Sequence, residues 1–283
     1  MKMKKEKLLR CINKTILFVM LFFVFLFFRY SPAVAQGQET ARIFQIQVKA
    51  DNFVVDRVLQ TYVIDESNKL IKYNPGGIQT AAYSNSRLGR IGSFDAENPF
   101  NILVFYPDFY TIVILDNNLA EKSVINLIDY ELENISVACL ATDNSIWVFD
   151  EVDSKLKKIS QTGKVLTESE SLGRLLSYSP APVLIKEVEQ KVYLLDANGI
   201  LVFDEFGHYL RMIPEKNIDY LQFLSDKIVY SKNKEIFVRS LTGMDDKAIS
   251  LQVPSNFFKK MVIRKDRMYV LNDEGIDVFL KKK

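Results

Sequence analysis

The chain has 283 residues and a mass of 32.6 kDa, enough for one large domain or two small ones. Its 48% hydrophobic and 25% charged residues are typical of a globular protein and exclude a disordered one. Residues 1–35 hold seven Lys or Arg and one acid, so the remainder is mildly acidic and has no electrostatic footprint for nucleic acid. One His and two Cys argue against a His/Cys zinc site, a Ser-His-Asp triad and a Cys-His nucleophile.

The first 35 residues predict an export signal. A basic stretch, residues 1–14, precedes 13 consecutive apolar residues, 16–28, and the small-residue triplet Ala33-Val34-Ala35 follows. This order is typical of a secretory signal peptide, here cleaved after Ala35. The alternative is an uncleaved membrane anchor, but a helix of that length spans only about 20 Å of a hydrocarbon core of about 30 Å.

Cysteine usage favours a bacterial periplasm as the destination. Cys11 precedes the apolar run, where it cannot serve as a lipoprotein anchor, and Cys139 is then the single cysteine of the exported chain. No internal disulfide can form, and Cys139 lies in an apolar run where a buried small hydrophobe is expected. We therefore expect a periplasmic protein with no membrane span after signal removal, associated with the outer membrane through a partner.

Beyond the signal, the sequence shows strand and hairpin patterning and no long stretch of helical period. Six similar hairpins recur, each with an apolar strand, an Asp or Asn, a polar turn and a second apolar strand. They begin at Tyr62, Ile112, Ile146, Val192, Ile228 and Met268. The Asp or Asn is expected to end its strand and to accept a hydrogen bond from its own backbone two residues on.

The repeat of about 40 residues predicts an all-β fold, because one four-stranded sheet of that size cannot bury both faces alone. Radial packing of such sheets gives a β-propeller. We predict a single domain, residues 36–283, with six blades; five or seven are the alternative counts. Only three Lys follow the last hairpin, so its blade lacks an outer strand, and the alternating run 43–48 is expected to close the ring there.

The acids that end the hairpin strands, Asp65, Asp116, Asp150 and Asp196, allow two interpretations. They are turn formers, or they converge in a central channel as the paired carboxylates of a hydrolytic propeller. Catalysis needs one special pair and these acids recur in most copies, so the turn role is favoured. Glu187 is either a buried acid or a residue on the exposed face of an outer strand. We predict no catalytic residue, no metal site and no cofactor.

The least repetitive segment, residues 83–110, is the candidate partner-binding region. It combines Arg87, Arg90, Asn98, Phe105 and Tyr106 with several Gly and Pro breaks. Arg and Tyr dominate the energetics of protein interfaces, so these five residues are predicted to contact a protein partner. The alternative is that the aromatic residues belong to the core of two blades and the Arg residues to a solvated turn.

The repeat as a whole resembles the NHL-like and quinoprotein-like six-bladed propellers. Three stretches, residues 88–106, 114–117 and 199–207, are similar to a family of small exported propellers from bacteria that use the type IX secretion system. That resemblance implies a place on the periplasmic side of the outer-membrane translocon, where one member acts as a plug of the secretion barrel. It implies no catalytic residues.

These features predict a non-catalytic periplasmic scaffold or plug that binds a protein partner at an outer-membrane complex, with the type IX translocon as the candidate complex. Two alternatives remain. One is a carbohydrate-active or other hydrolytic propeller that uses channel carboxylates. The other is a ligand-sensing propeller, which would have a deep apolar pocket with a few converging polar groups.

Overall fold

A computed structural model of the chain describes residues 42–280, except 225, 242–248 and 252–257. Every described residue belongs to one compact unit, Thr40–Lys283. The predicted signal peptide, residues 1–35, lies outside the described residues, so the fold bears only on the rest of the chain.

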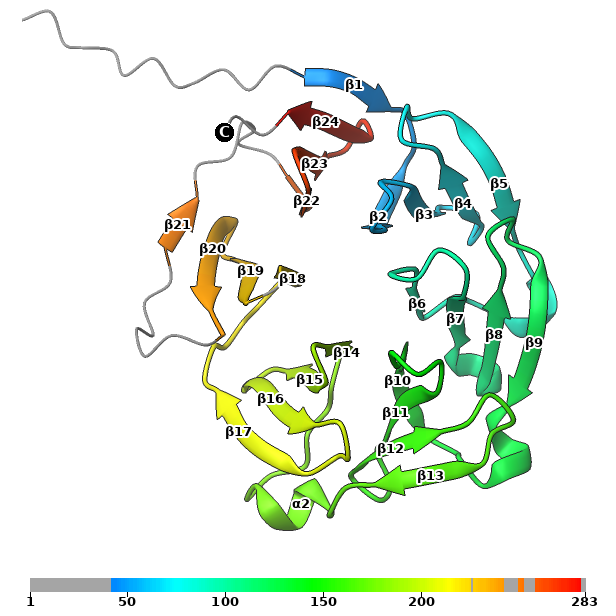
Figure 1. Cartoon of the computed structure of the whole chain (residues 1–283), viewed down its shortest axis with the longest axis vertical. Coiled ribbons are helices and arrows are strands. Elements are labelled where there is room, and N and C mark those ends of the chain that lie inside the picture. Colours follow the sequence, from blue (N-terminus) through cyan, green and yellow to red (C-terminus); the bar gives the residue numbers. More distant parts are fainter. Residues whose placement is uncertain (1–41, 225, 242–248, 252–257, 281–283) are drawn as a thin grey trace, which may run out of the picture. The chain divides into compact units, whose positions relative to one another are not determined.

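The described residues form six antiparallel sheets of four strands each, arranged as the blades of a β-propeller (Figure 1). The innermost strands are β2 (Ala50–Val55), β6 (Ser93–Asp95), β10 (Ile135–Leu140), β14 (Leu184–Val188), β18 (Tyr220–Leu224) and β22 (Lys260–Arg264). The second strands are β3 (Thr61–Asp65), β7 (Ile102–Tyr106), β11 (Ile146–Asp150), β15 (Lys191–Asp196), β19 (Lys227–Lys232) and β23 (Arg267–Leu271). The third strands are β4 (Leu70–Tyr73), β8 (Thr111–Leu115), β12 (Lys155–Ile159), β16 (Gly199–Asp204), β20 (Glu235–Ser240) and β24 (Ile276–Leu280). The outermost strands are β5 (Gln79–Tyr83), β9 (Glu121–Asn126), β13 (Val165–Glu168), β17 (Tyr209–Ile213), β21 (Ile249–Leu251) and β1 (Arg42–Ile46).

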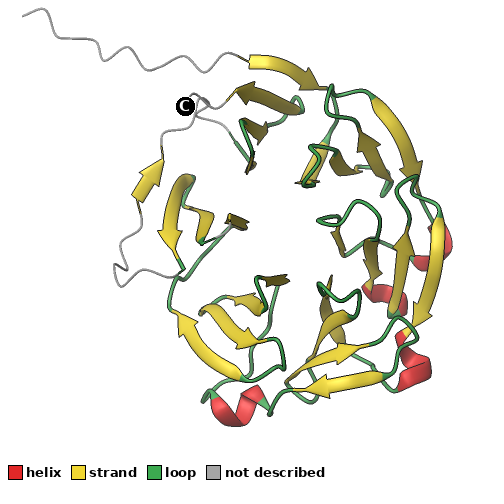
Figure 2. Cartoon of the chain, in the orientation of Figure 1, coloured by secondary structure: helices red, strands yellow, loops and turns green. Residues whose placement is uncertain are grey.

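We number the blades 1 to 6 by their innermost strands in chain order, from β2 to β22. Helices occur only as short segments in the connections of the described chain (Figure 2). They are η1 (Ser86–Leu88), η2 (Pro107–Phe109), η3 (Leu127–Tyr130) and α2 (Leu172–Leu175). Among the residues that the structure describes, no helix is long and apolar enough to cross a membrane.

The ring closes as the sequence predicts. Strand β1, from the start of the described chain, pairs antiparallel with β24 and supplies the missing outer strand of blade 6. The Arg42 guanidinium adds an ion pair at 3.0 Å to Asp277 of β24. The predicted closing strand and the prediction of six blades are both confirmed.

The core consists of six hydrophobic clusters, each of which joins two adjacent blades. Trp147 and Phe149 of blade 3, for example, pack with Leu194 and Phe203 of blade 4. Strands β7, β8 and β11 are buried along their whole length, which explains why at least four consecutive residues in each are apolar. Blades are therefore held together by the faces that a single sheet would leave exposed to water.

One of the six predicted hairpins is out of register with the others. Five of them are the second and third strands of a blade, whereas the hairpin that begins at Ile112 is β8 and β9, the third and fourth strands of blade 2. The equivalent turn of blade 2 is the η2 segment, where Pro107 interrupts the usual strand–Asp–turn pattern. The hairpin at Ile112 thus lies one strand later in its blade than the others, which explains the uneven spacing of the sequence repeats.

Candidate functional site

The six innermost strands line a central cavity of about 480 Å³. These strands run in the same direction along the channel. Lys260, which begins β22, contacts Asn52 of β2, and Arg264, which ends β22, contacts Val55 at the end of β2. The cavity therefore has a start end, where innermost strands begin, and a finish end, where they terminate.

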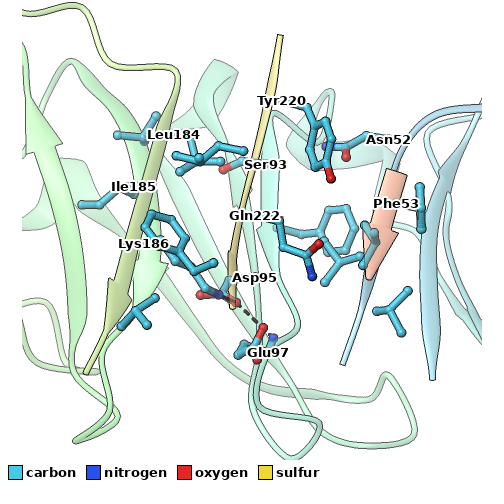
Figure 3. A pocket seen from close by; sticks show the side chains of 18 of the residues that line it. Asn52, Phe53, Ser93, Asp95, Glu97, Leu184, Ile185, Lys186, Tyr220 and Gln222 are labelled. Atoms are coloured by element: carbon cyan, nitrogen blue, oxygen red, sulfur yellow. Dashed lines mark hydrogen bonds and ion pairs between the residues drawn. The ribbon is translucent and has the colours of Figure 1, made fainter. Parts of the chain in front are cut away.

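Figure 3 shows this polarity in the side chains. Ser93, Tyr220 and Asn52 lie toward one end of the cavity, and Asp95 and Glu97 lie toward the other. Blade 2 contributes to both ends because β6 begins at Ser93 and ends at Asp95. The two ends therefore differ in the polar side chains that they present.

Two ion pairs cross the channel at the finish end. Lys186 Nζ lies 2.6 Å from Asp95 Oδ1, and the Arg264 guanidinium pairs with Glu97. Burial alone would lower the pKa of Lys186, but the negative charges of Asp95 and Glu97 outweigh that effect and hold the pKa above its usual value. The two pairs tie blade 2 to blades 4 and 6, which are not its neighbours in the ring.

The free edges of the innermost strands are bound by side chains from adjacent blades. Gln222 of blade 5 donates from Nε2 to the carbonyl oxygen of Ile263 at 2.6 Å and accepts from the Ile263 amide at 2.9 Å. Asp95 of blade 2 accepts from the Leu140 amide of blade 3 at 3.2 Å. These contacts satisfy backbone groups on the inner edges of β22 and β10, where no fifth strand pairs with them.

Glu187 belongs to the same system. Its carboxylate accepts hydrogen bonds from the Thr142 amide at 2.9 Å and from Trp147 Nε1 at 2.6 Å. It lies on β14, an innermost strand, so the alternative that places it on the exposed face of an outer strand is wrong. Glu187 joins blade 4 to blade 3.

The polar side chains at the start end have fewer hydrogen-bond and ion-pair partners. Lys260 Nζ donates to Asn52 Oδ1 at 2.6 Å and lies 5.6 Å and 5.8 Å from the ring centres of Phe53 and Tyr220. Burial lowers the pKa of Lys260 to about 8, because the charged form loses hydration there. Within the described part of the chain, the Tyr220 hydroxyl and Ser93 Oγ are buried without a hydrogen-bond partner.

The four hairpin acids do not reach this cavity. Asp65, Asp150 and Asp196 end second strands, Asp116 directly follows a third strand, and all four are absent from the lining. Each accepts hydrogen bonds from backbone amides of its own turn, beginning with the residue two positions on. Their predicted role in turns is confirmed, and the alternative that they converge in the channel is wrong.

Two of the five predicted partner-binding residues are wrong as contact residues. Phe105 and Tyr106 lie on β7 and are fully buried. Phe105 packs between blades 2 and 3 and Tyr106 between blades 1 and 2. A strand that packs against a blade on each side presents neither face to solvent, and these two aromatic residues are core.

Asn98 lies apart from the two arginines. Its Oδ1 accepts from the Phe100 amide at 3.1 Å, and it forms the turn before β7. The segment that carries Arg87 and Arg90 contacts Asp108, at the opposite end of β7. The structure therefore does not bring the predicted partner-binding residues into one surface.

The connection from blade 1 to blade 2, residues 84–92, is fixed to turns on both sides. Asn68 in the β3–β4 turn donates to the Gly89 carbonyl at 2.9 Å and accepts from the Ile91 amide at 2.8 Å. Asp108 in the β7–β8 turn accepts from the Arg90 amide at 3.2 Å. The loop is long but held in place by side chains of both blades.

This connection presents Arg87 and Arg90, whose side chains are exposed. Among the described residues, neither guanidinium forms an ion pair. The adjoining η2 turn adds Phe109, which is 52% exposed. We call Arg87, Arg90 and Phe109 the arginine loop surface; Phe109 is an exposed aromatic residue of this segment, whereas Phe105 and Tyr106 are buried.

Other reactive side chains lie away from the channel. His208 is exposed in the β16–β17 turn and lies 2.9 Å from Asp204. Cys139 is buried on β10, where burial raises the pKa of its thiol. Nowhere in the described ranges do three or more His, Cys, Asp or Glu side chains gather in a way that could hold a metal ion.

The fold and the channel define a six-bladed β-propeller, and the similarity to solved structures agrees with that class. The chain is similar to virginiamycin B lyase from Staphylococcus aureus, with a TM-score of 0.55 and 12% identity over 82% of this chain and 80% of that one. It is also similar to a streptogramin B lyase, with a TM-score of 0.55 and 17% identity over 81% of this chain and 78% of that one. A third similar structure, described as the extracellular domain of a hybrid two-component system from Bacteroides thetaiotaomicron, has a TM-score of 0.53 and 12% identity. It matches over 81% of this chain and 33% of that one.

At these identities the similarity shows the fold alone. No protein-family model matches the chain, and no curated protein sequence matches it. The solved structures include enzymes and the extracellular domain of a two-component system, so the shared architecture does not assign an activity.

Proposed function

We propose that the chain is a non-catalytic periplasmic binding module that holds a protein partner, at an outer-membrane complex, through the arginine loop surface. The observation that carries this proposal is the rigid display of two unpaired guanidinium groups beside an exposed aromatic ring. Arg and aromatic side chains are the commonest energetic anchors of protein interfaces. A partner with an acidic and apolar surface would complement this set.

The pairing of the channel carboxylates supports binding over hydrolysis. Asp95 and Glu97 are each engaged by a half-buried cation, Glu187 accepts two hydrogen bonds, and Glu189, the fourth carboxylate of the lining, is exposed. A glycosidase needs one carboxyl group as a proton donor and a second one free to act on the sugar or on water. The similar lyase has a catalytically inactive variant in which a histidine is replaced, whereas the single histidine of this chain, His208, lies in an exposed outer turn.

The periplasmic location rests on the export signal that residues 1–35 predict. The choice of an outer-membrane complex, and of the type IX translocon in particular, rests on the sequence resemblance.

The test is capture of a partner from detergent-solubilised native outer membranes. The wild-type protein is expected to retain a specific partner, and the variant Arg87→Ala/Arg90→Ala/Phe109→Ser is expected to lose at least 90% of it, because interface anchors each contribute about 2 kcal/mol or more. The matched control is Phe100→Ala/Lys164→Ala, which removes an exposed aromatic and an exposed cation from other turns. Equal capture by the triple variant and the control would contradict the proposed surface.

A further inference from the structure

The seam between blades 6 and 1 carries three large aliphatic side chains that the fold leaves exposed. Ile43 of β1 is 43% exposed, Ile78 in the β4–β5 turn is 67% exposed, and Leu280 at the end of β24 is 47% exposed. Strands β1 and β24 belong to blade 6, and the β4–β5 turn belongs to blade 1 (Figure 1). The pairing of β1 with β24 is irregular at Ile43, as in a β-bulge. Large apolar side chains that are exposed together mark interaction sites.

Specific contacts hold these three segments together. Gly77 of the β4–β5 turn lies so close to β1 that a Cβ there would approach the Phe44 ring to 2.7 Å. Arg267 donates to the Pro75 carbonyl of the same turn, and its guanidinium lies 6.0 Å from the centre of the Phe44 ring. Arg267 also pairs across the sheet with Leu280. The exposed apolar residues therefore belong to one surface.

Basic side chains surround these apolar residues. Arg42 begins β1, Arg267 begins β23, and Lys265 lies in the turn before β23. Two acids accompany them, Asp266 and Asp277, and Asp277 is paired with Arg42. The described residues at the seam thus have a small excess of positive charge.

The sequence adds positive charge at the same place. Residues 281–283, which follow β24 in the sequence and lie outside the described residues, are three lysines. With them, the charged residues named here comprise six cations and two acids. We call the described part of this region the seam surface; it consists of Ile43, Ile78, Leu280, Arg42, Lys265 and Arg267.

We propose that the seam surface docks on an anionic phospholipid bilayer. Its three aliphatic side chains enter the headgroup region, and the cations beside them contact lipid phosphates. Peripheral membrane proteins combine an exposed apolar face with Lys and Arg residues in this way. A second copy of this chain fits less well, because a two-fold interface would place these cations against their own copies.

The position of the export signal favours the same occupant. Residues 29–41 connect the apolar run 16–28 to β1, and they span at most about 45 Å when fully extended. An apolar run that enters the membrane, as expected of an export signal, holds the edge of blade 6 close to a lipid surface.

The seam surface and the arginine loop surface lie at opposite ends of the ring. Strands β24 and β4 terminate at the finish end, because each runs parallel to the innermost strand of its own blade. The connection that carries Arg87 and Arg90 leads into the beginning of β6, at the start end. A bilayer and a protein partner can therefore be bound at once.

The test is co-sedimentation of the chain from Gln36 onward, which contains the whole compact unit, with phospholipid vesicles. Phosphatidylcholine vesicles with about 30% phosphatidylglycerol supply the anionic surface, and pure phosphatidylcholine vesicles supply the neutral one. The wild-type protein is expected to bind the anionic vesicles at least tenfold more strongly at about 0.1 M salt. At about 1 M salt, where charges are screened over about 3 Å, most of that preference should be lost.

One pair of variants tests the apolar contact. Ile78→Ser/Leu280→Ser is expected to weaken binding to anionic vesicles at least tenfold, because two aliphatic side chains no longer enter the bilayer. The matched control, Leu166→Ser/Leu210→Ser, removes two leucines of similar exposure from the outer strands of blades 3 and 4 and leaves binding unchanged. All four side chains are exposed, and thermal unfolding confirms that each variant is folded.

A second pair tests the charge. Replacing the lysines at 281–283 by glutamine is expected to weaken binding to anionic vesicles at least tenfold, because each basic residue near the surface adds affinity. The control Lys164→Gln/Lys191→Gln/Lys216→Gln removes three exposed lysines elsewhere and is expected to weaken binding less than threefold.

Four results would overturn the proposed docking. They are no sedimentation with anionic vesicles, equal binding to both kinds of vesicle, equal binding by Ile78→Ser/Leu280→Ser and its control, and unchanged binding after replacement of the three lysines. A wild-type dimer that ultracentrifugation detects and that Ile78→Ser/Leu280→Ser abolishes would replace the bilayer with a second copy. These measurements contain no protein partner, so they can fail while partner capture succeeds, or succeed while it fails.

Discussion

Lys260 is expected to make the protein less stable than its methionine variant at neutral pH. Burial lowers the pKa of this lysine from its ordinary value of 10.5 to about 8. At 1.36 kcal/mol per unit, the folded state is disfavoured by up to about 3 kcal/mol whenever the lysine is protonated in both states. Lys260→Met removes this cost but also removes the hydrogen bond to Asn52 and the ring contacts, which together offset about 1–2 kcal/mol. The net gain at pH 7 is about 1–2 kcal/mol.

The sign of the pH dependence follows from which state holds the proton. Below pH 8 both states are protonated and the full cost is present. Between pH 8 and pH 10.5 the folded state releases its proton while the unfolded state keeps it, so the stability of the wild-type protein rises with pH. The advantage of Lys260→Met should therefore shrink by about 1.4 kcal/mol per pH unit above pH 8.

Urea unfolding of both proteins at intervals from pH 6.5 to pH 9.5 measures the difference between their free energies of unfolding. Titrating groups that both proteins share contribute equally to the two values and cancel in this difference. Lys191→Met, at an exposed position, serves as the control and should show a difference near zero throughout. An advantage of Lys260→Met that is the same at pH 6.5 and pH 9.5, or a variant less stable than wild type at both, would refute the reasoning.

Two further predictions concern the seams between blades. Gln222→Leu leaves the Ile263 amide and carbonyl without their partner and should cost about 1–3 kcal/mol in urea unfolding; a loss below about 0.5 kcal/mol would mean that water replaces the amide. Gly275→Ala should loosen the ring closure, because its φ is 145° and a Cβ there would lie 2.2 Å from the Ile46 carbonyl oxygen. Early hydrogen exchange confined to β1 and β24 is expected in that variant. Deletion of residues 36–50 removes β1 and should abolish cooperative unfolding. Full amide protection of β24 in either protein would contradict this account of closure.

The fold could be predicted because its determinants are local. Each blade carries its own short apolar strands, and most blades carry an Asp or Asn turn, as at Asp65 and Asp196, which hydrogen bonds over two to four residues set. Closure was predictable from a count of strands, since the last hairpin had no outer partner. The burial of Phe105 was not predictable, because apolar residues beside a Gly- and Pro-rich loop can belong either to the loop or to the core.

The channel could not be predicted because its residues are brought together only by the ring. The Lys186–Asp95 pair spans 91 residues and the Lys260–Asn52 contact spans 208. Each of these residues lies in a short innermost strand whose local sequence does not identify the residue's partner. A charged or amide residue inside an otherwise apolar innermost strand, such as Gln222, is the sequence feature that indicates the channel. The recurring hairpins indicate only the second and third strands of the blades.

The pairing of β1 with β24 joins residues 235 positions apart, as the Arg42–Asp277 contact shows. During synthesis or export from the amino-terminal side, β1 emerges first and its partner emerges last, so an incomplete chain presents two bare sheet edges at once. Such edges are templates for intermolecular pairing. Truncation at either side of the seam is therefore expected to lead to aggregation before it leads to loss of binding.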